Sequence, residues 1–276
     1  MPAAYAHLSF GRSVLRDLPA GKARTLILAN PALFEIGLQG PDILFFYHPL
    51  NHHPVNRIGH ELHEQSAQSF LARNVCQTAD EQGLAYLLGF ICHYTLDSEC
   101  HTLVEYFMEE TGKGHSDIET DLERELMTRD NLDARKHAPA AYIVDSSAYA
   151  SVIAPFYGVE DRQVKRALAT MKLVSRALTP SNRVKHTLLT KAGKRMGERS
   201  IVSELTMDWF PDPVYQNINH ELILGLEQAI PVAIGLMENY LAWLNGETTL
   251  SQRFQPTFSF DPEELVRLKE RYSCLS

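Results

Sequence analysis

Hydrophobic and polar positions recur with the period of an α-helix along nearly the whole chain, and no stretch sustains the two-residue alternation of a strand. The pattern therefore predicts an all-α fold. The predicted helices cover residues 21–28, 58–76, 81–109, 116–127, 145–156, 160–177, 183–197, 216–245 and 261–272. Pro31 should break or restart the helical pattern after the first of them, and Pro231 should kink the longest.

Glycine and proline mark the expected interruptions of this pattern. The run Gly37-Leu-Gln-Gly-Pro-Asp42 is typical of a turn, because it holds two glycines and a proline. Asp42 should therefore lie on or beside a tight loop. Residues 51–56 also have the composition of a turn.

No internal repeat, low-complexity tract or linker divides the chain. We therefore expect one multi-helix domain over residues 1–246, with the chemically informative residues within 1–125 and further helices over 140–246. Residues 247–276 are expected to form a C-terminal tail with a short helix.

The composition sets limits on location and partners. A chain of 276 residues with 45% hydrophobic content can bury a sizeable core. The net charge of -8 argues against broad electrostatic binding to polyanions, so we expect no stable nucleic-acid complex and at most peripheral membrane contact. The N-terminus lacks the pattern of a secretory signal, and the apolar stretch Leu222–Leu244 is interrupted by charged residues, which favours a cytoplasmic protein. Four irregularly spaced cysteines are expected to be reduced.

The most informative motif is His93-x-x-x-Asp97-x-x-x-His101, which is followed by His115-x-x-x-Glu119. Residues four apart project from the same side of a helix, so each spacing directs its side chains toward a shared point. Imidazole and carboxylate groups without a thiolate are typical of zinc, manganese or iron(II) in a hydrolytic site. The motif therefore predicts a metal centre that activates water.

The neighbouring apolar residues favour metal binding over a solvated stripe. Leu84, Leu88 and Ile91 lead directly into His93, so the polar groups continue a face that should be buried. Burying them without partners would cost several kcal/mol. The competing hypothesis, in which these histidines are surface groups of a helical interaction protein, predicts no stoichiometric metal.

Several short motifs resemble the zinc-dependent phospholipase C family of bacteria. They are His-x-x-Phe-Gly over 7–11, Gly-Pro-Asp over 40–42, Leu-His-Glu over 62–64, Gly-Phe-Ile-Cys-His over 89–93, and the continuation through Asp97, His101, His115 and Glu119. They cover roughly the first 125 residues in the order of the family. Similar metal constellations occur in the single-strand-specific zinc nucleases, which are expected to share the fold.

The resemblance implies an all-α enzyme with two or three zinc ions that cleaves phosphodiester bonds. Its ligand set, carried over position by position, would be His7, Asp42, His63, His93, Asp97, His101, His115 and Glu119. One zinc would be held by His63, His93 and Asp97 with Asp42 beside it, a second by Asp97 and His7, and a third by His101, His115 and Glu119. His60 is an alternative to His63, because it lies one turn earlier on the same predicted helix.

Mechanism follows from that implied site. Metal-bound water would supply hydroxide near neutral pH, and Asp42 would act as general base or as a ligand. Carboxylates close in sequence, namely Glu61, Glu64 and Glu99, are candidate acceptors for the second ring nitrogen of the histidines.

One departure from the family concerns the start of the chain. Secreted members bind zinc through a processed N-terminal tryptophan, whereas this chain starts Met1-Pro2, which leaves the His7 site the least defined. The alternative activities are a nuclease, a nucleotidase or another soluble phosphodiesterase. A non-catalytic metal-binding or interaction protein on the same scaffold is the alternative from a different class.

Overall fold

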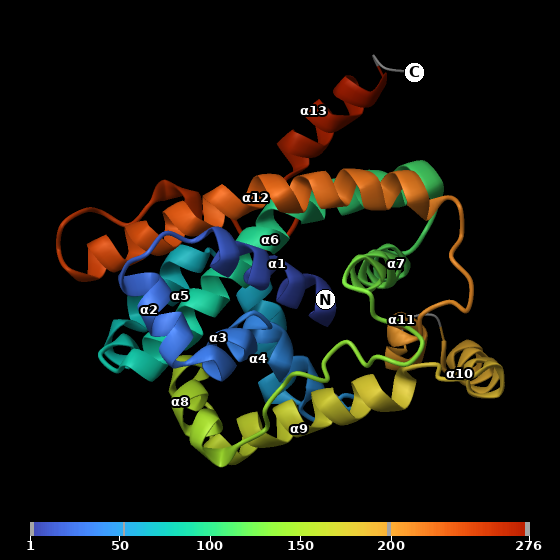
Figure 1. Cartoon of the computed structure of the whole chain (residues 1–276), viewed down its shortest axis with the longest axis horizontal. Helices are drawn as coiled ribbons and strands as arrows, with labels where there is room; N and C mark the ends of the chain where they lie inside the picture. Colours follow the sequence, from blue (N-terminus) through green and yellow to red (C-terminus); the bar gives the residue numbers. More distant parts are fainter. Residues whose placement is uncertain (1–2, 52, 198–199, 274–276) are drawn as a thin grey trace.

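The computed structural model describes residues 3–51, 53–197 and 200–273, and within these ranges the fold is all-α, as predicted, with no strand (Figure 1). The α-helices are α1 (Ala4–Asp17), α2 (Lys22–Ala29), α3 (Pro31–Gly37), α4 (Pro54–His63), α5 (Ala67–Arg73), α6 (Glu81–Thr111), α7 (His115–Arg129), α8 (Ser147–Tyr157), α9 (Asp161–Leu178), α10 (Arg183–Met196), α11 (Ile201–Leu205), α12 (Tyr215–Leu244) and α13 (Pro262–Ser273). Three 3₁₀ segments join them: η1 (Gly40–Phe46), η2 (Val75–Thr78) and η3 (Gln252–Phe254).

Helix α6 is the centre of the fold. It has 31 residues, and every residue from Gly83 to Asp97 is buried, because other helices pack around this half. The Asp80 side chain caps its first turn by accepting a hydrogen bond from the backbone N–H of Gln82 at 3.3 Å. Gly112, with a φ of 68°, ends it in the left-handed conformation.

Helices α3 and α6 cross with their backbones nearly in contact. A Cβ atom on Gly37 would lie 2.1 Å from the carbonyl oxygen of Tyr86, and one on Gly89 would lie 2.2 Å from that of Phe34. Only glycine permits this approach at both positions. The crossing places the chain after α3 directly over the middle of α6.

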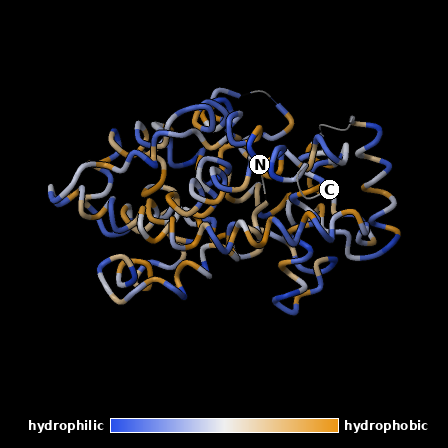
Figure 2. The backbone as a smooth tube through the Cα atoms, turned by 90° about the horizontal axis from the view of Figure 1, so that it is seen from above, coloured by the Kyte–Doolittle hydropathy of each residue, from blue (hydrophilic) through white to orange (hydrophobic). Residues whose placement is uncertain are grey.

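Helix α12 lies along α6 and also packs on α1 and α7 (Figure 1). Among the described residues it is the one helix long and apolar enough to cross a membrane, but its contacts are those of a core helix. It runs through Pro231 without interruption. Figure 2 shows hydrophobic and hydrophilic positions alternating along the helices, with hydrophilic residues prevailing at the outer turns.

The predicted helix over 58–76 is wrong, because the structure divides this region into α4, α5 and η2. Ser66 starts α5 as its N-cap, and its hydroxyl accepts a hydrogen bond from the backbone N–H of Gln68. The turn expected over 51–56 is also shorter than predicted. Helix α4 already begins at Pro54, whose fixed φ suits the first helical position.

The segment between α12 and α13 belongs to the core, although a C-terminal tail was expected from residue 247. Phe254 and Phe258 are fully buried. The Tyr94 hydroxyl donates to the carbonyl of Arg253 at 2.7 Å, and the Ser66 hydroxyl donates to that of Phe254 at 3.0 Å. This segment therefore closes over α6 beside the histidines described next.

Candidate metal centre

Five elements bring the eight candidate ligands together. Helix α6 supplies His93, Asp97 and His101, α7 supplies His115 and Glu119, and α1, η1 and α4 supply His7, Asp42 and His63. Their donor atoms form three groups whose members lie within 4.8 Å of one another: His7, His93 and Asp97; Asp42, His63 and His93; His101, His115 and Glu119. All the residues in these groups are candidates from the sequence, and none of those candidates other than His60 lies outside them.

Asp97 lies at the middle of the cluster. Its Oδ2 is 3.2 Å from Nε2 of His93 and 3.9 Å from Nε2 of His63. Its Oδ1 is 3.3 Å from Nε2 of His7 and 3.7 Å from Nε2 of His101. Because the two oxygens face different pairs of histidines, the carboxylate has the geometry to bridge two cations.

Backbone carbonyl groups orient three of the histidines. Leu38 lies 3.2 Å from Nδ1 of His93, Gly59 lies 2.8 Å from Nδ1 of His63, and Phe258 lies 2.5 Å from Nδ1 of His101, measured to each carbonyl oxygen. With Nδ1–H donating to a carbonyl, Nε2 of each ring keeps its lone pair and faces the cluster.

Sequence proximity suggested Glu61, Glu64 and Glu99 as the acceptors for the histidines. For Glu61 and Glu99 this prediction is wrong, because both pair with arginines. Glu61 pairs with Arg57 at 3.3 Å, and Glu99 pairs with Arg253. Phe258 was missed because it lies far along the chain. Its ring also contacts the ring of His63, with centroids 5.2 Å apart.

Asp42 reaches the cluster from η1, two residues after Gly40. Its Oδ1 is 3.0 Å from Nε2 of His63, and its side chain is fully buried. Gly40 adopts a φ of 49°, and a Cβ there would lie 2.2 Å from the ring of His93. Glycine therefore lets η1 lie against that ring.

The group formed by His101, His115 and Glu119 is the one nearest to solvent. Nε2 of His115 is 3.0 Å from Oε1 of Glu119, and the His115 side chain is 30% exposed. Nε2 of His101 lies 3.8 Å from the same oxygen. Burial lowers the pKa of His101, but Asp97 and Glu119 outweigh burial and raise it to about 8.

Buried atoms without hydrogen bonds test whether a metal fits. Nδ1 of His7, Nε2 of His93, Nε2 of His63 and Oδ2 of Asp97 have no hydrogen-bond partner among the described residues. Leaving such groups unsatisfied is costly. Burial raises the pKa of Asp97, but the surrounding histidines hold it well below its usual range, so the group is a carboxylate. Divalent cations would satisfy the Nε2 atoms of His63 and His93 and Oδ2 of Asp97, so these residues fit zinc.

His60 and His63 differ in position. The His60 side chain is exposed and stacks on the ring of Phe45, with centroids 4.4 Å apart. It belongs to none of the three groups, whereas His63 belongs to one. The geometry thus favours His63 as the ligand.

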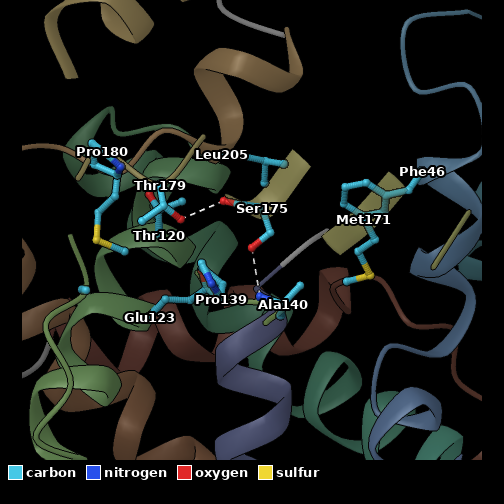
Figure 3. Close-up of a pocket in the computed structure, with 13 residues that line it drawn as sticks. Phe46, Thr120, Glu123, Pro139, Ala140, Met171, Ser175, Thr179, Pro180 and Leu205 are labelled. Atoms are coloured by element: carbon cyan, nitrogen blue, oxygen red, sulfur yellow. Dashed lines mark hydrogen bonds between the residues drawn. The ribbon is translucent and has the colours of Figure 1, made fainter. Parts of the chain in front are cut away.

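Figure 3 shows an apolar pocket formed by residues of α1, α7 and α9. It lies between Ala4 of α1, Glu123 of α7 and Met171 of α9. Glu123 accepts a hydrogen bond from the backbone N–H of Tyr5 and so holds the start of the helix that carries His7. Burial raises the pKa of Glu123 to about 8, although its backbone hydrogen bonds act in the opposite direction.

Comparisons with known proteins agree with this geometry. The family model described as zinc dependent phospholipase C matches residues 6–167, which is more than half of the chain. No curated protein and no solved structure matches the chain.

Proposed function

The chain belongs to the zinc-dependent phospholipase C family, and from this membership we propose that it is a metal-dependent hydrolase of phosphoric esters with phospholipids as substrates. The observation that carries the proposal is the arrangement around Asp97. One buried carboxylate faces four histidines, and several of the donor atoms have no hydrogen-bond partner among the described residues.

In this proposal the three groups of donors are three zinc sites. The first would be held by His63, His93 and Asp42, and the second by His7 and Asp97, with His93 shared between these two groups. The third would be held by His101, His115 and Glu119. Bound zinc would offset the charge of a phosphate and lower the pKa of bound water toward neutrality. The backbone carbonyls of Leu38, Gly59 and Phe258 keep the imidazole rings in the tautomer and orientation that binding requires.

Asp42 has two candidate roles, ligand and general base. Its complete burial and its 3.0 Å approach to Nε2 of His63 favour the role of ligand. A general base needs a reacting water within hydrogen-bond reach. Substitution by asparagine keeps one oxygen donor but not the basicity, so Asp42→Asn separates the two roles: retained metal with lost activity indicates the base.

A groove next to His63 supports a substrate with an apolar part. A groove of about 750 Å³ lies between η1, α4 and α11. Phe45 lines it and stacks against the ring of His63, with centroids 5.4 Å apart. Phe46 and Leu205 line both this groove and the apolar pocket of Figure 3. These apolar side chains would contact an acyl chain.

The first test is the metal content per chain, measured by mass spectrometry on protein purified without an affinity tag. We expect two or three zinc ions in the wild type and the loss of at least one in Asp97→Ala, because this carboxylate faces both sides of the cluster. Asp161→Ala is the matched control, since this exposed carboxylate lies at the start of α9. Wild-type protein that cannot be loaded with metal would refute the proposal.

The second test is hydrolysis of a panel containing a phospholipid, a single-stranded oligonucleotide, a nucleoside monophosphate and a generic phosphodiester. We expect the phospholipid to have the highest kcat/KM. A preference for the oligonucleotide or the nucleotide would instead indicate a nuclease or nucleotidase. No hydrolysis by fully loaded protein would indicate a non-catalytic metal-binding protein.

A further inference from the structure

The positive charge of this acidic chain is concentrated in one segment. Residues 162–197, which we call the basic segment, hold ten of the 26 Lys and Arg residues and no Asp or Glu, whereas all 34 Asp and Glu residues lie elsewhere. The segment comprises most of α9 and all of α10. The net charge of -8 therefore conceals a local charge of the opposite sign.

Helix α10 carries half of that charge on an exposed surface. It packs against α11, and Gly193 is its one buried residue. Val184, Leu188, Lys191 and Arg195 follow the spacing i, i+4, i+7 and i+11, so they form one stripe, which we call the α10 face. Val184 and Leu188 are 71% and 62% exposed. Exposed aliphatic and basic side chains thus share one side of the helix.

An aromatic pair extends this surface at the start of α10. Phe210 is 64% exposed. The guanidinium of Arg183 lies 5.5 Å from the centroid of the Phe210 ring and 5.9 Å from that of Trp209. Arg135 approaches the Trp209 ring to 5.4 Å as well. Aromatic rings flanked by arginines are typical of surfaces at the boundary between water and lipid.

Among the described residues, no acidic side chain pairs with a basic residue of α10. Within residues 3–51, 53–197 and 200–273, no carboxylate forms an ion pair with Arg183, Lys185, Lys191, Lys194 or Arg195. Two other bases of the basic segment differ in this respect: Arg162 pairs with Glu160, and Lys172 pairs with Asp145. The charges of α10 are thus available to an anionic partner.

We propose that the α10 face, together with Phe210, docks on the surface of bilayers that contain anionic phospholipids. The lysines and arginines would lie among the lipid headgroups, and the aliphatic and aromatic side chains would enter the boundary with the acyl chains. Helix α11, which packs on α10, also lines the groove beside Phe45, so docking would bring that groove near the lipid. Docking of this kind is a binding event and does not require hydrolysis.

Nucleic acid is the other polyanion that a basic helix could bind, but the apolar side chains favour lipid. Val184 and Leu188 lie in the middle of the charged surface, where a phosphodiester backbone offers them no apolar contact. Binding to nucleic acid would rest on charge alone. Binding to a bilayer uses both the charge and the apolar surface.

The test is cosedimentation with vesicles of phosphatidylcholine alone and with vesicles that also contain phosphatidylglycerol, with and without a metal chelator. We expect binding to the anionic vesicles only, weaker at high salt and unchanged by the chelator, because the α10 face contains no candidate metal ligand. Loss of binding on chelation would show that the metal centre, and not α10, holds the lipid. This arm separates failure of the docking surface from failure of the proposed hydrolase.

Three variants locate the surface. Lys191→Gln with Arg195→Gln should weaken binding to anionic vesicles about 25-fold, at about fivefold for each basic residue. Leu188→Ser should weaken it about tenfold. Arg16→Gln with Arg267→Gln removes the same charge from side chains that are 69% and 74% exposed on other helices, and should leave binding unchanged.

Two results would overturn the proposal. Equal losses for the α10 pair and the control pair would mean that net charge alone matters. A normal affinity of Leu188→Ser for vesicles, with tighter binding of the wild type to a DNA duplex, would assign the surface to nucleic acid. Circular dichroism of each variant checks that its fold is retained.

Discussion

The metal centre and helix α10 are built in opposite ways. Around α6 the backbones meet without side chains between them, most of the candidate ligands are buried, and backbone carbonyl groups orient three of the histidines. Helix α10 buries one glycine and exposes its charges. The comparison shows that this chain places its chemistry where positions are fixed and its proposed contact with a partner where side chains are free to adapt.

The largest effect that separates the two regions comes from adding one methyl group to each. Gly89→Ala should destabilise the protein by about 3 kcal/mol or more, because the new Cβ would meet the carbonyl oxygen of Phe34 at 2.2 Å. In Gly193→Ala the closest atom is the Ser203 hydroxyl, at 2.6 Å, and a small side chain can move aside. Alanine also favours a helix, so this variant should change stability by less than about 1 kcal/mol.

Urea unfolding of the two variants beside the wild type measures the difference. Equal losses of stability would mean that α10 is packed as tightly as the core and that the comparison fails.

The second effect compares two histidines one turn apart on α4. His63→Ala should remove one metal ion per chain and lower kcat/KM for the preferred phosphodiester by more than about 100-fold. Removing a residue that only hydrogen-bonds to a metal ligand costs up to about 100-fold, so a larger loss indicates a ligand. His60→Ala should keep the metal content, because His60 only stacks on Phe45 at the edge of the groove. Metal analysis and kinetics on both variants decide the matter. A loss of metal in His60→Ala but not in His63→Ala would reverse the assignment.

The candidate ligands could be predicted from the sequence where their spacing is local. His93, Asp97 and His101 occupy successive turns of α6, and His115 and Glu119 do the same on α7, so helical geometry alone groups them. The more distant His7, Asp42 and His63 followed only from the resemblance to a family. The structure brings all of them within one cluster.

Tertiary contacts account for what the sequence did not reveal. Phe258 orients His101 from 157 residues away, and no local pattern marks its carbonyl as an acceptor. The break between α4 and α5 depends on Ser66, which both caps α5 and donates a hydrogen bond to Phe254. The basic segment can be read directly from the sequence, but the net charge of the whole chain does not reveal it.

A smaller effect concerns the buried carboxyl that joins α7 to α1. Because burial raises the pKa of Glu123 from 4.5 to about 8, the folded protein binds this proton more tightly than the unfolded chain does. The contribution to stability is fully present at low pH and is lost as pH rises toward 8, by up to about 1.4 kcal/mol per pH unit. Glu123→Gln cannot titrate, so its stability should lack this slope.

Urea unfolding of both proteins between about pH 5 and pH 8 gives the difference between the two slopes, which cancels the histidines common to both. The exposed Glu160, at the start of α9, provides a matched control in Glu160→Gln. Parallel curves for the wild type and Glu123→Gln would show that Glu123 is already ionised in the folded protein.

The smallest effect tests whether α10 opens independently of the core. Asn182 caps α10 by accepting a hydrogen bond from the backbone N–H of Lys185 at 2.9 Å, as Asp80 caps α6. Removing either cap with alanine should cost about 1 kcal/mol. In Asn182→Ala that cost should appear locally, as amide hydrogen exchange about fivefold faster in α10 with unchanged global unfolding, because this helix has little buried surface to hold it. In Asp80→Ala it should appear as a slightly lower global stability, since the buried half of α6 opens only when the protein unfolds. If the α10 amides also exchanged only through global unfolding, α10 would belong to the same cooperative unit as the metal centre, and its exposed charges would rest on a rigid surface.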